Sequence, residues 1–236
     1  MSPPRSDDTP GRRERVRRTL VAGIATVLPW LFLRSLRRGL AGVYVRGERA
    51  ALAPGTMLAI NHHSWWDAYL AWYLARRAGA PLAALMDDAQ LRRFPFFRHH
   101  GAIDATRPRE LARRVRGGAL GVVFPEGEMF PPGPPHALAP GVVRVARWAG
   151  APVHPVALRV VARGLPRPEA FLSIAPAASD EDDLARSLAA ELAALDATIG
   201  SADPEREPPG FDVWLRGASS PDRRARGIER IWSEPP

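Results

Sequence analysis

The sequence predicts an α/β protein with a mixed, mostly parallel sheet flanked by helices. From Val43 onwards, short apolar runs alternate with longer amphipathic segments, which is the pattern of strands separated by helices. Thr56–Ile60 (TMLAI) and Leu120–Phe124 (LGVVF) are apolar throughout rather than at every second residue. Strands that are buried on both faces have this pattern, so we expect helices on both faces of the sheet.

The first 42 residues are predicted to form two segments outside this domain. Residues 1–11 are polar and proline-rich, which predicts disorder. Residues 12–42 predict an amphipathic helix pair, broken at Pro29, in which the 15 residues Thr19–Leu33 are uncharged and flanked by arginines. As a helix that stretch spans about 22 Å, against about 30 Å for the hydrocarbon core of a bilayer. We therefore expect a peripheral or monotopic membrane anchor on the cytoplasmic face, or alternatively a helix pair buried against the domain.

Local signals then define the elements of a folded domain over residues 43–200. Proline opens Pro108–Arg116, Gly150 closes Gly141–Ala149, and acidic residues precede Leu184–Ile199, as expected at helix ends. The other expected helices are Trp65–Ala78 and a turn at Ala89–Arg93, and the other expected strands are Val43–Arg46, Leu82–Met86, Ala102–Asp104, Val153–Val161 and Phe171–Ala175. Residues 125–140 predict a proline-rich loop. Residues 201–236 predict a proline-rich tail with one weak helix near Asp222–Trp232.

Composition and charge exclude several kinds of chemistry and of partner. The sequence has no cysteine, and all 33 basic residues are arginine. These absences exclude a thiol nucleophile, a thiolate-bound metal and a Schiff-base lysine. Residues 1–50 hold 11 arginines against 4 acidic residues, whereas the rest of the chain is nearly neutral. A basic segment confined beside apolar residues suits an anionic membrane surface, so we expect no nucleic-acid partner.

Two polar motifs directly follow buried strands, where α/β proteins place ligands. In the first, His62 and Asp67 are five residues apart across the predicted start of a helix, so the carboxylate can reach the imidazole. A histidine held by a carboxylate is a general base for a hydroxyl, although these residues taken alone also fit an ordinary capped helix start. In the second motif, Glu126 and Gly127 follow Phe124–Pro125, and alone they fit an acidic turn.

Together the two motifs resemble those of the glycerolipid acyltransferases of the lysophosphatidic acid (1-acylglycerol-3-phosphate) acyltransferase type. That family has an Asn-His-x-x-x-x-Asp motif followed further along the chain by Phe-Pro-Glu-Gly. The matching positions are Asn61, His62, Ser64 and Asp67, then Gly101 and Arg107, then Phe124, Pro125, Glu126 and Gly127, and finally Pro152–Val156. The resemblance makes residues 43–200 an acyltransferase domain.

The resemblance implies transfer of a fatty acyl group from acyl-CoA or acyl-carrier protein to a hydroxyl of a lysophospholipid. His62 would remove the hydroxyl proton and Asp67 would orient His62, with no acyl-enzyme, no metal and no cofactor. The residues implied to bind the substrates are Asn61, Ser64, Gly101, Arg107, Pro125, Glu126, Gly127 and Glu128. Among them, Arg107 would face a phosphate, which a guanidinium matches in geometry.

One departure from the family pattern leaves the acceptor open. The family continues its second motif with a small hydroxyl residue and a cation, whereas here Glu128 and Met129 follow Gly127. A carboxylate at this position favours a non-phosphorylated acceptor, such as a glycolipid or another alcohol. Two further alternatives are an inactive membrane-tethered binding module and a metal-dependent hydrolase. The hydrolase would use His62, His63, Asp67, His99 and His100.

Overall fold

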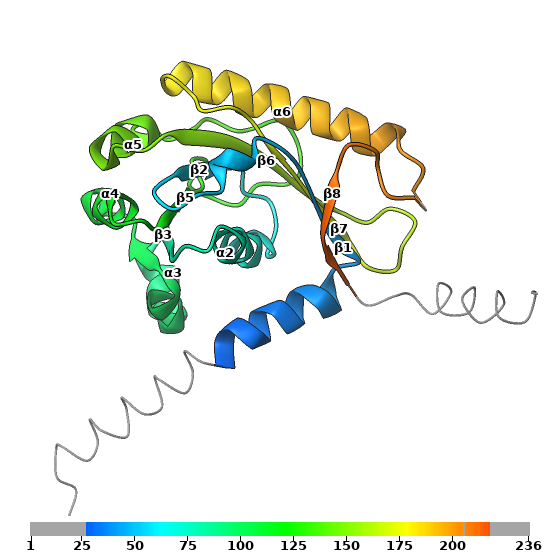
Figure 1. Cartoon of the computed structure of the whole chain (residues 1–236), viewed down its shortest axis with the longest axis horizontal. Helices are drawn as coiled ribbons and strands as arrows, with labels where there is room; N and C mark the ends of the chain where they lie inside the picture. The colour runs from blue at the N-terminus through cyan, green and yellow to red at the C-terminus, as the bar shows by residue number, and fades with distance from the viewer. Residues whose placement is uncertain (1–26, 205, 218–236) are drawn as a thin grey trace, which may run out of the picture.

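The computed structural model describes residues 27–204 and 206–217 of the 236-residue chain. Within these residues, eight strands form one sheet in the order β4-β3-β5-β2-β6-β7-β1-β8 (Figure 1). The strands are β1 (Gly42–Gly47), β2 (Met57–Ile60), β3 (Leu82–Met86), β4 (Ala102–Asp104), β5 (Leu120–Val123), β6 (Val153–Val161), β7 (Glu169–Ile174) and β8 (Asp212–Arg216). The β6–β7 and β1–β8 pairs are antiparallel and the other neighbours are parallel, which confirms the predicted mixed sheet.

Helices cover both faces of the sheet, as predicted (Figure 1). They are α2 (Asp67–Arg77), α3 (Asp88–Arg93), α4 (Pro108–Arg116), α5 (Val142–Ala149) and α6 (Glu181–Ser201), with the short helices η1 (Arg49–Ala51) and η2 (Pro95–His100). Strand β2 shows why two faces are needed. Its side chains Leu58 and Ile60 pack in one cluster with α2, whereas Met57 and Ala59 pack in another with α4 and α5. Helix α6 packs over β6 and β7 on the same side as α5.

The helix predicted after Pro29 is present, and Pro29 lies in the first described turn of it; the segment predicted before the break lies outside the described residues. Residues 27–39 form one uninterrupted helix, which we call the N-terminal helix; residues 12–26 lie outside the described residues. Its side chains Phe32, Leu36 and Leu40 are buried in the cluster that contains α2. Packing of this apolar face stabilises the helix. No helix in the described residues is long and apolar enough to cross a membrane.

The predicted C-terminal tail contains a strand that the sequence analysis missed. Strand β8 pairs antiparallel with β1 and so closes that edge of the sheet. The hydroxyl of Tyr73 on α2 donates to the carbonyl oxygen of Trp214 at 2.7 Å, which ties β8 to the domain. The sequence Asp-Val-Trp-Leu-Arg is short and lies among prolines, so its strand signal was weak. The weak helix predicted near residues 222–232 lies outside the described residues.

Candidate active site

The two motifs meet at one edge of the sheet. Strands β2 and β5 are parallel neighbours, so their carboxyl ends lie side by side. The first motif follows β2 and leads into α2, and the second opens the loop between β5 and α5, which we call the 124–141 loop. Loops at the carboxyl ends of parallel strands are the usual ligand site of α/β proteins, as the sequence analysis expected.

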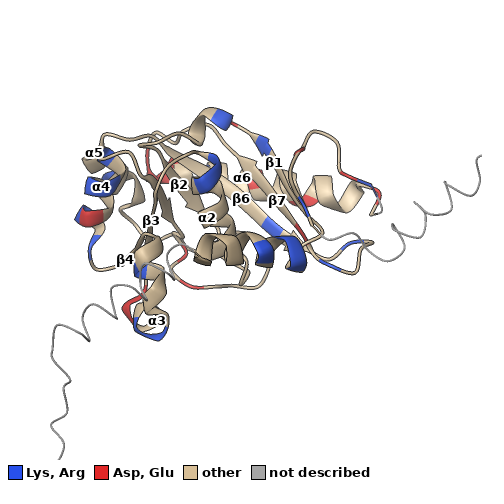
Figure 2. Ribbon diagram, turned by 60° about the horizontal axis from the view of Figure 1, so that its bottom comes forward, with Lys and Arg blue, Asp and Glu red and all other residues tan. Residues whose placement is uncertain are grey.

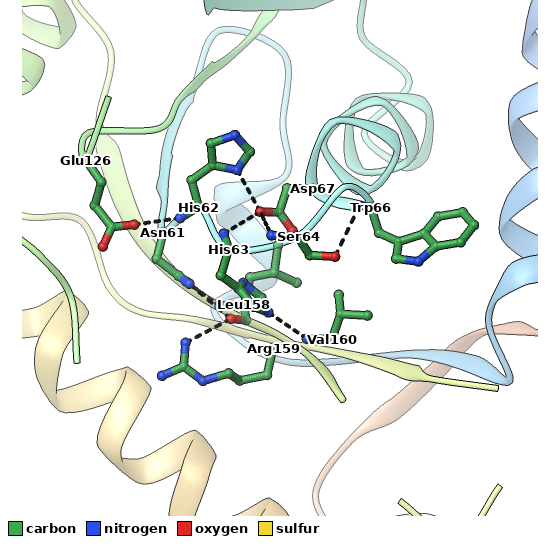
Figure 3. A network of polar contacts seen from close by, with 10 residues as sticks. All are labelled: Asn61, His62, His63, Ser64, Trp66, Asp67, Glu126, Leu158, Arg159 and Val160. Carbon is green, nitrogen blue, oxygen red and sulfur yellow. Dashed lines mark hydrogen bonds and ion pairs between the residues drawn. The ribbon is translucent and has the colours of Figure 1, made fainter. Parts of the chain in front are cut away.

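His62 and Asp67 form the hydrogen-bonded pair that the spacing predicted. The Nδ1 atom of His62 lies 2.7 Å from Oδ2 of Asp67, and the Asp67 side chain is fully buried at the start of α2 (Figure 3). The same oxygen accepts the backbone N–H groups of His63 and Ser64 at 2.8 and 2.9 Å. The carboxylate is therefore fixed by three donors, and it fixes the loop in return.

This contact sets the tautomer of His62. A carboxylate only accepts hydrogen bonds, so Nδ1 of His62 carries the proton and Nε2 presents a lone pair. Among the described residues Nε2 has no hydrogen-bond partner, and the side chain is 23% exposed. The ring stacks on Phe124 at a centroid distance of 4.4 Å. His62 is thus held between a carboxylate and an aromatic ring with its basic nitrogen accessible, as a general base requires.

The side chain of His63 points away from this pair and makes a structural hydrogen bond. Its Nε2 accepts the backbone N–H of Val160, at the end of β6, at 3.0 Å (Figure 3). Burial lowers the pKa of His63, and the nearby Arg159 lowers it further, so the ring is neutral at pH 7. His63 therefore anchors the loop to β6 and is not a second base.

Three of the residues implied to bind substrate make structural contacts within the protein. The Asn61 side chain is buried and makes two hydrogen bonds to the backbone of Leu158, accepting its N–H at 2.7 Å and donating to its carbonyl at 3.1 Å. Gly101 is buried at φ +98°, where an added Cβ would lie 1.8 Å from the carbonyl oxygen of Leu82. Ser64 accepts the N–H of Trp66 at 3.2 Å. Asn61 and Ser64 therefore support the loop beside His62, whereas Gly101 precedes β4 at the opposite edge of the sheet.

Glu126 ties the two loops together. One carboxylate oxygen accepts the backbone N–H of His62 at 2.6 Å, and the other accepts that of His136 at 2.9 Å. The carbonyl of His62 in turn accepts the N–H of Phe130 at 3.0 Å. Both backbone polar groups of His62 are therefore held by the 124–141 loop, and the Glu126 carboxylate is already used in holding them.

The remaining expected residues lie around this edge. Pro125 is buried, whereas Gly127 and Glu128 are exposed in the 124–141 loop. Arg107 is exposed just before α4, after strand β4. Because β5 and β3 lie between β2 and β4, Arg107 starts about 14 Å across the sheet from His62. Arg107 and Glu128 can therefore face the more distant parts of a substrate bound at His62.

The residues of the metal-site alternative are not brought together. Residues His99 and His100 lie in η2, before β4 begins, whereas His62 follows the end of β2. Among residues 27–204 and 206–217, no three His, Cys, Asp or Glu side chains are grouped so that they could hold one metal ion.

Comparison with known proteins agrees with this geometry. The family model described as Acyltransferase matches residues 42–159, which is half of the chain and contains both motifs. The chain belongs to the acyltransferase family. The crystal structure of the 1-acyl-sn-glycerophosphate (LPA) acyltransferase PlsC from Thermotoga maritima has the same fold, with a TM-score of 0.53 and 20% identity over 80% of this chain and 84% of that chain. No curated protein matches the chain in sequence.

One positioning residue of this acyltransferase escaped the sequence analysis. Arg159 is a buried arginine in β6 that pairs with Asp196 of α6 at 2.6 Å and donates to the carbonyl of Gly133 at 2.6 Å. It therefore ties the 124–141 loop to both β6 and α6. A single arginine in the apolar run Val153–Val161 was the available signal, because a charge inside a strand that is buried on both faces needs a fixed partner.

The role of Glu126 can be separated from substrate binding by kinetics. In Glu126→Gln the amide presents a donor to one of the two N–H groups that Glu126 now accepts, so the loop contact at His62 or at His136 is lost. We expect kcat of the acyltransferase to fall about tenfold with little change in the acceptor KM, since a misplaced base slows the reaction more than binding. Asp182→Asn makes the same charge change on an exposed residue of α6 and should leave kcat within about twofold. A raised KM at constant kcat would instead show that Glu126 holds the acceptor.

Proposed function

We propose that this acyltransferase moves a fatty acyl group from acyl-CoA or acyl-carrier protein to a hydroxyl of lysophosphatidic acid. The observation that carries the proposal is the His62–Asp67 pair, with Nδ1 to Oδ2 at 2.7 Å and Nε2 accessible. Family membership supports acyl transfer. The fold likeness to PlsC, itself a 1-acyl-sn-glycerophosphate acyltransferase, supports a lipid acceptor.

The proposed reaction is a direct attack by the acceptor on the thioester. Nε2 of His62 takes the proton of the acceptor hydroxyl as its oxygen bonds to the thioester carbonyl carbon. Asp67 stabilises the imidazolium, and its burial keeps water from competing for the Nδ1 proton. When the tetrahedral intermediate collapses, the carbon–sulfur bond breaks and the departing thiolate receives the proton from His62. The products are an ester and a free thiol, and no acyl-enzyme forms.

A two-product assay tests this proposal. The full-length protein is incubated with lysophosphatidic acid and either acyl-CoA or acyl-carrier protein, with and without a metal chelator. Thiol release is measured with a colorimetric thiol reagent, and phosphatidic acid is measured by mass spectrometry. We expect the two products in equal amounts, dependent on the acceptor and unaffected by chelation. Thiol release that does not need the acceptor would indicate a thioesterase instead.

The acceptor phosphate is tested through Arg107 and Glu128. If the acceptor carries a phosphate, Arg107→Ala should lower kcat/KM. The lost transition-state stabilisation should be about 2–3 kcal/mol, the size of a hydrogen bond to a charged group. Glu128→Thr should then raise kcat/KM for lysophosphatidic acid, because an exposed carboxylate in the 124–141 loop repels a phosphate. Kinetics with lysophosphatidic acid and a glycolipid acceptor provide the measurement. Two results together would favour the uncharged acceptor: Glu128→Thr is less active than the parent on the glycolipid, and the parent has no activity on lysophosphatidic acid.

We also propose that the N-terminal segment holds the enzyme at an anionic membrane surface. Val27, Trp30 and Leu31 are exposed on the N-terminal helix, beside Arg34. The exposed fraction is 58% for Trp30 and 39% for Leu31. Trp30→Ser/Leu31→Ser should weaken binding to anionic vesicles about tenfold and leave the melting temperature unchanged, because these side chains do not contribute to the core. Vesicle co-sedimentation measures the binding. Equal sedimentation of the variant and the parent would contradict the proposal.

A further inference from the structure

A second concave site lies at the opposite edge of the sheet from His62. A cavity of about 640 Å³ is lined by residues at the amino ends of parallel strands: Pro81 and Leu82 at β3, Gly101 before β4, and Ala119 before β5. The active-site loops leave the carboxyl ends of β2 and β5. The four residues of β5 therefore separate the two sites by roughly 13 Å.

The lining of this cavity is strongly basic. Four arginines line it, namely Arg76 of α2, Arg98 of η2, and Arg113 and Arg114 of α4, and no acidic residue does. Two nearby carboxylates offset part of this charge and leave four guanidinium groups against two carboxylates. Glu110 is shared between Arg113 and Arg114, Arg98 lies 3.7 Å from Asp88, and Arg76 stacks near Trp72. Figure 2 shows both blue (basic) and red (acidic) segments on α3 and α4.

Helix dipoles account for some of these arginines but not for their gathering at one cavity. Arg76, Arg113 and Arg114 lie in the last turns of α2 and α4, where the helix dipole favours cations. Arg98 comes from η2, a separate short helix. The four arginines that line this one recess thus come from three elements. Planar guanidinium groups arranged in this way match the oxygens of a phosphate.

The cavity also has an apolar side next to the N-terminal helix. Trp72, Leu82 and Pro29 line it, and Pro29 is followed on the helix by the exposed Trp30 and Leu31. A phosphate in the recess could therefore carry an apolar chain that lies against this helix. We propose that the cavity is a second, non-catalytic site for a terminal phosphate group, as found in a phosphatidic acid headgroup or in free phosphate.

Calorimetric titration of the full-length protein tests the site with three probes. The probes are dihexanoyl phosphatidic acid, inorganic phosphate, and dihexanoyl phosphatidylcholine as the zwitterionic control. We expect Arg98→Gln/Arg113→Gln to weaken binding of the phosphatidic acid at least tenfold and to leave kcat on a soluble acceptor unchanged. The matched control Arg49→Gln/Arg186→Gln removes the same charge from exposed residues that do not line the cavity, and should bind like the parent.

The outcomes separate the ligand sources and the catalytic site. The titrations are repeated in an Arg107→Gln background, which weakens phosphate binding at the proposed acceptor site. Binding that persists there and is lost on adding Arg98→Gln/Arg113→Gln belongs to the cavity, whatever the acceptor is. Loss of inorganic phosphate binding in the cavity variant would identify free phosphate as a sufficient ligand, and loss of phosphatidic acid binding alone would identify the lipid. If the cavity variant binds every probe as the control does, or only loses thermal stability, the arginines serve the helix ends and the proposal is wrong.

Discussion

Replacing His62 by alanine is expected to lower kcat/KM by about 10²–10⁴ and to leave the fold intact, because loss of a general base has an effect of this size. The ring is partly exposed and its backbone contacts to Glu126 and Phe130 do not need the side chain. Steady-state kinetics and circular dichroism are the measurements. Full activity of His62→Ala would remove the base from the mechanism.

The adjacent histidine is the matched control, and the structure decides which substitution to use. His63→Ala would leave the Val160 N–H without its acceptor, so a loss of activity could come from a loosened loop. Glutamine has an amide oxygen that can take the place of Nε2. His63→Gln should therefore stay within about tenfold of the parent, since it touches only positioning. Equal losses in His62→Ala and His63→Gln would indicate that the loop, not the base, is what each variant damages.

The largest effect on stability is expected at a buried ion pair far from the active site. Arg163 and Glu169 are 6% and 2% exposed, with Nε to Oε2 at 2.8 Å. Arg163 also donates to the carbonyl of Asp203 and stacks over Phe171, so it joins the start of β7 to the segment before β8. Arg163→Met leaves the Glu169 carboxylate buried without its cation. We expect the free energy of unfolding to fall by about 3–5 kcal/mol in urea titrations.

Two further variants test the cause of that loss. In Arg163→Met/Glu169→Leu no charge remains to be buried, so most of the stability should return. Arg186→Met removes an arginine that is 71% exposed, and the loss there should stay below about 1 kcal/mol. A double variant as unstable as Arg163→Met would show that packing of the arginine, rather than the stranded carboxylate, carries the effect.

The sequence predicted the sheet well where strands are apolar throughout, and poorly where tertiary contacts decide. Leu82–Met86, Ala102–Asp104 and Val153–Val161 have the predicted bounds, because each is a short, largely apolar run between turn or helix signals. Strand β8 exists because β1 offers it an unpaired edge, and a five-residue segment does not reveal that. The burial of Phe32 and Leu36 against α2 is likewise a tertiary contact that the local sequence does not reveal.

The site was predictable in its chemistry but less so in its division of labour. The five-residue spacing of His62 and Asp67 predicted their contact, since a helix start returns the carboxylate to the preceding loop. Nothing in the spacing indicated that Asn61 pairs with the backbone of Leu158, or that Glu126 holds the backbone of His62. These are contacts between segments that lie far apart in sequence. The motif shows that such residues matter, and only the fold shows which act on neighbouring backbone.

The pairing of β1 with β7 sets an order of events during synthesis. Arg46 and Ser173 are paired in the sheet but are 127 residues apart in the chain. A ribosome adds roughly 5–20 residues per second, so β1 emerges on the order of 10 s before its parallel partner exists. A similar interval separates the synthesis of the N-terminal helix from that of Leu172 and Ile174, which complete the cluster of Phe32, Leu36 and Leu40. The apolar side of the N-terminal helix can therefore pack in two stages: Tyr69 and Trp72 of α2, which contact Phe32, are synthesised about 40 residues after it, and the contact with β7 is completed last.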